Sequence, residues 1–194
     1  MNKSIAESFE SVKQSDTNLE KENNMKEFQC ESFEYVNTGK LRFIGIDAYC
    51  KCDDWNAHWE RSLELLPQLE AMLDEYGAFV TYPSALIHSG GKEVGIEEHF
   101  LAGYFFKQGT PVPEGYDYFD IDAEVLGYGI YTTDDFPGDM ESVYVMARDK
   151  ILNDGFLIPY PQGYCHAEIY TDGRDFEGAL RIGYMFPTNR ESNI

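Results

Sequence analysis

Tyr164-Cys165-His166-Ala167-Glu168-Ile169-Tyr170 is the stretch from which we predict the fold. Side chains alternate between the two faces of a strand, so one face carries Cys165, Ala167 and Ile169. The opposite face carries Tyr164, His166, Glu168 and Tyr170. The first face is small and apolar and suits packing under helices, whereas the second suits a cleft wall or an exposed edge. Because a glutamate among tyrosines can have an unusual proton affinity, Glu168 is the first candidate for function.

Composition limits the classes of partner. The chain has 194 residues, enough for one well-packed domain, with 35 acidic and 15 basic side chains and a formal charge of −20. Such a charge repels phosphate backbones and anionic membranes, so we expect no direct nucleic-acid or membrane binding. Aromatic residues make up 15% of the chain, with 14 tyrosines. Tyrosine walls are apolar yet form hydrogen bonds, which favours a pocket for flat organic molecules.

The four cysteines show neither a secretory signal nor a disulfide framework, so we expect reduced thiols in a cytoplasmic protein. Cys50, Cys52 and His58 lack a second pair of ligands at zinc spacing, and we expect no metal or other cofactor. The chain has no apolar run of about eighteen residues, as a membrane helix requires. It also has no phosphate-binding glycine loop and no Gly-x-Ser-x-Gly motif.

The order of elements follows from the pattern of apolar residues. Residues 1–27 are polar and read as a disordered leader, and 190–194 form a tail. We predict strands at 28–36, 41–49, 79–88, 99–107, 116–121, 126–132, 164–170 and 180–186. We predict helices at 55–76 and 138–153. Within the first helix Pro67 should kink or divide the helix, and Gly77 should form a left-handed cap at its end; Gly155 should end the second helix.

Two landmarks recur in the same order along the chain. Gly77 precedes Tyr82-Pro83 as Gly155 precedes Tyr160-Pro161, 78 residues later, and Gly103-Tyr104 is matched by Gly183-Tyr184 after 80 residues. We therefore predict one α+β domain at 28–189, made of two strand-helix-strand-strand modules at 28–108 and 116–187. A pseudo-twofold axis would join them into an antiparallel sheet, with both helices on one face and a ligand cleft on the other. The candidate cleft tyrosines are Tyr82, Tyr104, Tyr131, Tyr160, Tyr170 and Tyr184.

Over 28–187 the chain resembles the GyrI-like small-molecule-binding proteins, whose fold also forms the effector-binding domain of AraC-type and MerR-type bacterial regulators. The likeness is carried by Pro111-Val-Pro-Glu-Gly115, Gly127-Tyr-Gly-Ile-Tyr131, Ala167-Glu168-Ile169-Tyr170 and 180–187. The resemblance implies that Glu168 lies on the floor of the cleft and meets cationic or polar parts of flat ligands. Two departures are Asp122 to Glu124 in place of Pro-Ala-Gly, and His166 where an aromatic residue is common.

The resemblance leaves three functions open. A passive sensor or sink would bind flat hydrophobic or cationic compounds with Glu168 as the counter-charge. A detoxifying hydrolase, which we favour, would open the cyclopropane of cyclopropanoid toxins with Glu168 as general base. Glu98, Glu97, Tyr131 or His166 would assist it. The third function is an acidic inhibitor of DNA gyrase.

The remaining candidate ligand contacts are the side chains expected on the cleft wall or its rim. They are Trp55, Trp59, Tyr82, Tyr104, His166, Tyr170 and Tyr184. Both tryptophans lie on the apolar face of the predicted helix 55–76, so they could pack in the core instead of contacting a ligand. We expect a monomer or a homodimer whose partner is a small hydrophobic or aromatic ligand.

Overall fold

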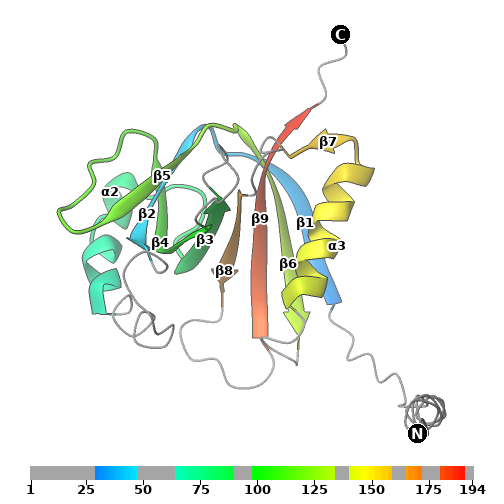
Figure 1. Cartoon of the computed structure of the whole chain (residues 1–194), viewed down its shortest axis with the longest axis horizontal. Coiled ribbons are helices and arrows are strands. Elements are labelled where there is room, and N and C mark those ends of the chain that lie inside the picture. Colours follow the sequence, from blue (N-terminus) through cyan, green and yellow to red (C-terminus); the bar gives the residue numbers. More distant parts are fainter. Residues whose placement is uncertain are drawn as a thin grey trace, which may run out of the picture.

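The computed structural model describes residues 29–47, 64–89, 98–133, 140–158, 165–171 and 180–190, which form an antiparallel sheet with helices (Figure 1). The strands are β1 (Gln29–Asn37), β2 (Leu41–Asp47), β3 (Ser84–Ser89), β4 (Glu98–Lys107), β5 (Asp117–Ile121), β6 (Val125–Thr133), β7 (Phe156–Leu157), β8 (Cys165–Tyr170) and β9 (Leu180–Arg190). The helices are α2 (Leu73–Tyr76) and α3 (Met140–Asn153), and residues 64–70 are also helical. Within these ranges no helix is both long and apolar enough to cross a membrane.

The local signals around the first helix are only partly right. Pro67 does not end the helical run 64–70; the break comes at residues 71–72, before α2. Gly77 is not a left-handed cap, because its φ is −57°. The positive φ falls instead on Phe79, at 70°, which turns the chain toward β3. Gly155 follows the end of α3, as predicted, and has a positive φ of 78°. It therefore forms the conformation that glycine adopts without steric cost.

The strand order is β1-β6-β9-β8-β3-β4-β2-β5, with β7 pairing with β9 outside this path. The predicted modules are present as β2-helix-β3-β4 and β6-α3-β8-β9. They meet where β3 pairs with β8, at the centre of the sheet. The outermost strands are exchanged: β1 pairs with β6 of the second module, and β5 pairs with β2 of the first. Neither exchange was predicted, since spacing along the chain does not show which module an outer strand joins.

Both helical segments cover the same face of the sheet, as predicted. Val143, Ala147 and Ile151 of α3 pack against β6, β8 and β9 in one core cluster. Leu66 and Leu69 pack against Tyr104 and Phe106 of β4 in a second cluster. Tyr104 alternates in step with Phe100 of the first cluster, so the two clusters share a face. Figure 1 shows α3 and α2 at opposite ends of this face with β8 and β3 between them.

The predicted place of the glutamate face is wrong: it is the helix-covered face, not the opposite one. Tyr170 belongs to the cluster under α3, and Glu168 alternates in step with Tyr170. The small apolar face of β8, with Cys165, Ala167 and Ile169, is buried in a third cluster. Partly buried residues 78–80, Phe119 and Tyr128 pack against that cluster. These residues, and not the helices, cover the apolar face of β8. The aromatic face of β8 therefore lies under the helices.

Candidate functional site

Glu168 accepts two tyrosine hydrogen bonds on the central strand β8. The Tyr170 hydroxyl donates to Oε2 at 2.9 Å, and the Tyr184 hydroxyl donates to Oε1 at 3.0 Å. Tyr170 lies two residues further along β8 on the same face, whereas Tyr184 is the partner of Glu168 directly across on β9. Alternation within one strand and register with the next therefore bring these three side chains together. Glu168 itself is partly buried, while both tyrosines are buried.

Two opposing effects act on the Glu168 carboxyl group. Burial raises its pKa above the ordinary value, and the hydrogen bonds from Tyr170 and Tyr184 oppose that rise. Burial, reinforced by the nearby carboxylate, raises the pKa of both tyrosines as well. The tyrosines consequently remain protonated donors over the physiological range. Each carboxylate oxygen accepts one of these bonds and has a further lone pair for a ligand or a water.

A cluster of rings adjoins this glutamate on the same face. The His166 ring lies 4.8 Å from the Tyr144 ring of α3, 5.7 Å from that of Phe186 and 6.1 Å from that of Tyr184. Burial lowers the pKa of His166 to about 4, so its imidazole is neutral at pH 7. The histidine of this cluster is therefore uncharged, and the carboxylate of Glu168 is joined to the cluster through the hydroxyl of Tyr184.

The other neighbours of Glu168 differ in size on its two sides. On β3 its direct partner is Ala85, whose side chain is one methyl group, so the bulk on that side comes from Ile87 and Phe100. On the β9 side Tyr131 of β6 meets Tyr184 edge-on, with ring centroids 6.3 Å apart. Burial raises the pKa of Tyr131, which keeps its hydroxyl protonated. Glu168 thus has bulky aromatic neighbours on the β9 side and a small direct neighbour, Ala85, on the β3 side.

Of the predicted ligand contacts and catalytic helpers, His166, Tyr131, Tyr170 and Tyr184 lie near Glu168, whereas others lie elsewhere. Tyr104 packs under the other helix, where its hydroxyl donates to Glu70 Oε1 at 2.6 Å. Tyr82 is 44% exposed ahead of β3. Glu98 is the first residue of β4 and pairs with Ser89. Trp55, Trp59, Glu97, Tyr160, residues 1–27 and the cysteine pair at 50 and 52 lie outside the described residues.

Tyr144 is a member of this ring cluster that we did not predict. It follows Val143 on α3 and contacts both His166 and Phe186. The predicted helix 138–153 includes Tyr144, and the buried stripe of Val143, Ala147 and Ile151 passes beside it, so a wider apolar stripe would have included it. The part of the chain that the structure describes contains no group of three metal-ligating side chains. The chemical groups of the candidate site are a carboxylate, phenols and a neutral imidazole.

No family model matches the sequence. No match was found among the curated proteins either. Solved structures do match its fold. A putative bacterial transcription regulation protein from Staphylococcus aureus superposes with a TM-score of 0.50 at 12% identity, covering 84% of this chain and 98% of its own.

Two further structures are similar over most of their length. A hydrolase from Listeria innocua has a TM-score of 0.48 at 10% identity, covering 81% of this chain and 92% of its own. SAV2435, solved bound to tetraphenylphosphonium, has a TM-score of 0.48 at 13% identity, with coverages of 81% and 94%. At such identities the similarity concerns the fold alone. The chain has the α+β fold of the Staphylococcus aureus protein, in agreement with the GyrI-like fold that its sequence resembles.

Proposed function

We propose that this protein binds flat hydrophobic or cationic aromatic small molecules beside Glu168. The observation that carries the proposal is a partly buried carboxylate held by Tyr170 and Tyr184 next to a cluster of neutral rings. An ionised carboxylate removed from water is stabilised by a cation, and the ring faces attract the same cation through their quadrupoles. The net charge of −20 adds a long-range attraction for cations.

Hydrolysis of cyclopropanoid-type toxins is the second candidate, and the raised pKa of Glu168 favours it. A carboxylate with a raised pKa is a better general base near neutrality. In this reaction Glu168 takes a proton from water while the water oxygen bonds to a cyclopropane carbon. The ring carbon–carbon bond breaks, and its electron pair moves into the conjugated carbonyl, whose oxygen gains charge. Tyr131 or His166 would assist by hydrogen bonding to that oxygen.

A calorimetric titration with tetraphenylphosphonium tests binding, with Glu168→Gln as the variant. Glutamine keeps the shape of the side chain but removes its charge, so we expect the affinity to fall about tenfold or more. The matched control is Glu70→Gln, because Glu70 accepts a bond from Tyr104 in the other half of the sheet. This control should bind like the wild type. Neutral triphenylphosphine oxide should bind the wild type more weakly than the cation does.

Equal affinity of the wild type and Glu168→Gln would contradict the proposal, as would the lack of saturable binding. A time course with a cyclopropanoid alkylator, followed by chromatography with mass detection, then separates the two candidates. Many turnovers to the water adduct by the wild type, and none by folded Glu168→Gln, would support hydrolysis. Protection of the compound without conversion would leave binding as the function.

A further inference from the structure

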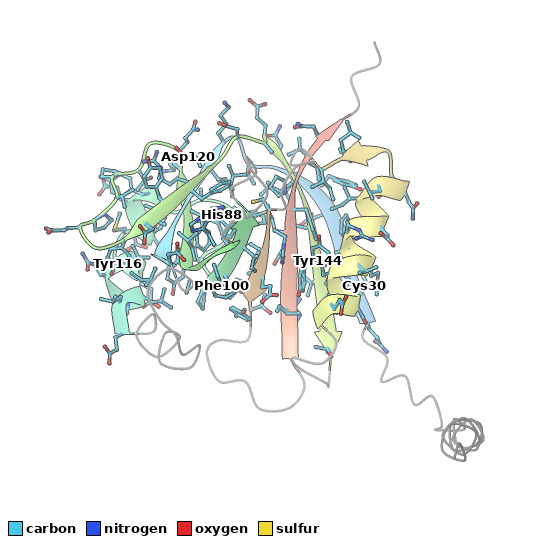
Figure 2. The ribbon with its side chains drawn as sticks, viewed as in Figure 1. Cys30, His88, Phe100, Tyr116, Asp120 and Tyr144 are labelled. Atoms are coloured by element: carbon cyan, nitrogen blue, oxygen red, sulfur yellow. The ribbon has the colours of Figure 1, made fainter. Side chains whose placement is uncertain are left out.

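A second polar cluster lies on the face of the sheet opposite to Glu168. The His88 ring of β3 stacks between His99 of β4, at 4.9 Å and 16°, and Phe119 of β5, at 4.1 Å and 27°. His99 Nδ1 lies 2.7 Å from Asp47 Oδ2 of β2. The stack therefore joins β3, β4 and β5, and Asp47 of β2 is paired with its outer histidine; Figure 2 labels His88.

His88 is buried as a neutral imidazole. Its side chain is 9% exposed, and its Nδ1 is buried without a hydrogen-bond partner among the described residues. Burial first, and then repulsion from His99, lower the pKa of His88 to about 4, against a smaller opposite effect of Asp47. A proton on His88 would place a charge inside an apolar stack, which is costly.

The other titratable groups on this face stabilise a protonated His88 only weakly, and the main such effect is the smaller attraction to Asp47. Across from His88 on β8 lies Cys165, a buried thiol whose pKa is raised by burial and which stays neutral. From β5, Asp117 shares the face of Phe119, two residues away, and lies across from Gly45 of β2. His99 and Asp47 already form a pair with each other. Protonated His88 is therefore better stabilised by water than by its neighbours.

Strand β5 covers one face of the His88 ring and is the easiest part of the stack to move. It is an edge strand of five residues that pairs only with β2 in the described sheet. His99 lies on β4, which pairs with both β2 and β3. Arg42 holds β5 closed through paired bonds of 2.7 and 2.8 Å to Asp120 and a contact with the Tyr118 ring. Short edge strands with few attachments open at lower free energy than central strands.

We propose that the His88–His99–Phe119 stack is an acid-operated switch: protonation of His88 releases Phe119 and opens β5 from the edge of the sheet. Opening β5 removes the ring that covers one face of His88 and gives the imidazole access to water. The switch does not depend on Glu168, which lies on the opposite face, or on any ligand.

The expected size of the effect follows from proton linkage. In the closed state the pKa of His88 is about 4, and in the opened, hydrated state it is the ordinary 6.5. The opened state takes up the proton more readily, so its population rises as the pH falls through this window. Between pH 7 and pH 5 the opening equilibrium of β5 should increase about 20-fold.

Amide hydrogen exchange of the full chain at pH 7 and pH 5, corrected for intrinsic exchange rates, tests this switch. We expect protection of the β5 amides to fall about 20-fold and to stay below that of the β6 and β9 amides, whose exchange requires unfolding of the whole sheet. In His88→Phe, which keeps an aromatic ring in the stack but cannot titrate, β5 should show no such fall. The control His166→Phe removes a buried histidine from the other face, and its β5 amides should lose protection as those of the wild type do.

Two results would overturn the switch. One is an equal loss of β5 protection in His88→Phe. The other is equal protection of the β5, β6 and β9 amides at both pH values, which would mean that β5 opens only when the whole sheet unfolds. If His88→Phe does not fold, an NMR titration of the wild-type His88 ring replaces it. Ring signals that titrate near pH 6.5 while β5 stays protected would equally overturn the switch.

Discussion

The two halves of the sheet carry the same Gly-Tyr pair, yet each tyrosine has a different partner. On β4, Tyr104 donates to Glu70, an exposed residue in the helical run 64–70. On β9, Tyr184 donates to the partly buried Glu168 on the neighbouring strand β8. Both tyrosines are 1% exposed. The first bond ties a helix to the sheet, whereas the second holds a carboxylate in an aromatic environment.

The difference arises from the central strands. On the helix-covered face β3 presents Ala85 and Ile87, while β8 presents His166 and Glu168. The first half therefore keeps the duplicated framework apolar, and the second half carries the polar chemistry. Repeating a module supplies a scaffold, but a few substitutions on one central strand make the candidate site.

The largest difference between the halves should come from the two glycines. A Cβ at Gly103 would meet the backbone oxygen of Ile44 at 1.9 Å, and backbone cannot yield locally. A Cβ at Gly183 would meet mainly the Tyr128 ring, at 2.7 Å, which can move. We expect Gly103→Ala to lower the free energy of unfolding by about 3 kcal/mol or more, and Gly183→Ala by about 1 kcal/mol. Urea denaturation measures both, and equal losses would contradict this reading of the two halves.

The second difference is that the second half of the sheet, which contains His166, should lose stability in acid. The folded-state pKa of His166 is about 4, below its unfolded value of 6.5, so its contribution to stability is lost as the pH falls from 6.5 to 4. Glu168 has the opposite sign, because its raised pKa gives stability at low pH that is lost as the pH rises. His166→Phe should reduce the loss of stability between pH 7 and pH 4 by up to ~3 kcal/mol. Denaturation at several pH values checks this, and an unchanged slope in folded His166→Phe would contradict it.

The smallest effect is expected from the tyrosine hydroxyls. Tyr104→Phe removes a bond to an exposed glutamate and should cost about 0.5 kcal/mol, whereas Tyr184→Phe should cost about 1 kcal/mol. Tyr184→Phe also removes a bond that lowers the pKa of Glu168, so that pKa should rise. As the pH falls, Glu168 of this variant should therefore take up its proton, and lose its affinity for a cation, at a higher pH than in the wild type. Titrations of tetraphenylphosphonium across pH measure this shift, and Tyr104→Phe, the control, should not show it.

Much of the fold could be predicted from the sequence. Alternation and helical periodicity located the described strands apart from β7, and the repeat landmarks implied two modules with helices on a shared face. Signals of conformation at single residues were less reliable. Gly77 was wrong as a left-handed cap because the chain places its positive φ two residues later, at Phe79. The left-handed conformation at a helix end depends on the path of the following segment, which no local pattern specifies.

The arrangement of side chains around Glu168 was predictable where a single strand contains it. Alternation put Glu168, Tyr170 and His166 on one face of β8, and the repeat pointed to Tyr184. Tyr104 was chosen by the same repeat, but it lies under the other helix because the two modules occupy opposite ends of the sheet. The stack of His88, His99 and Phe119 gave no sequence signal, since it joins β3, β4 and β5 across the sheet.

The sequence by itself determined the alternation of faces along β8, the repeat and the acidic, aromatic character of the chain. These depend on neighbours in the chain and on composition. Only the tertiary structure decided which face lies under the helices, which strands are exchanged between modules and which carboxylate each tyrosine meets. Those features depend on register and packing between distant segments: residues 78–80 and the partly buried Phe119 and Tyr128 pack against the apolar face, so the aromatic face of β8 lies on the side of α3.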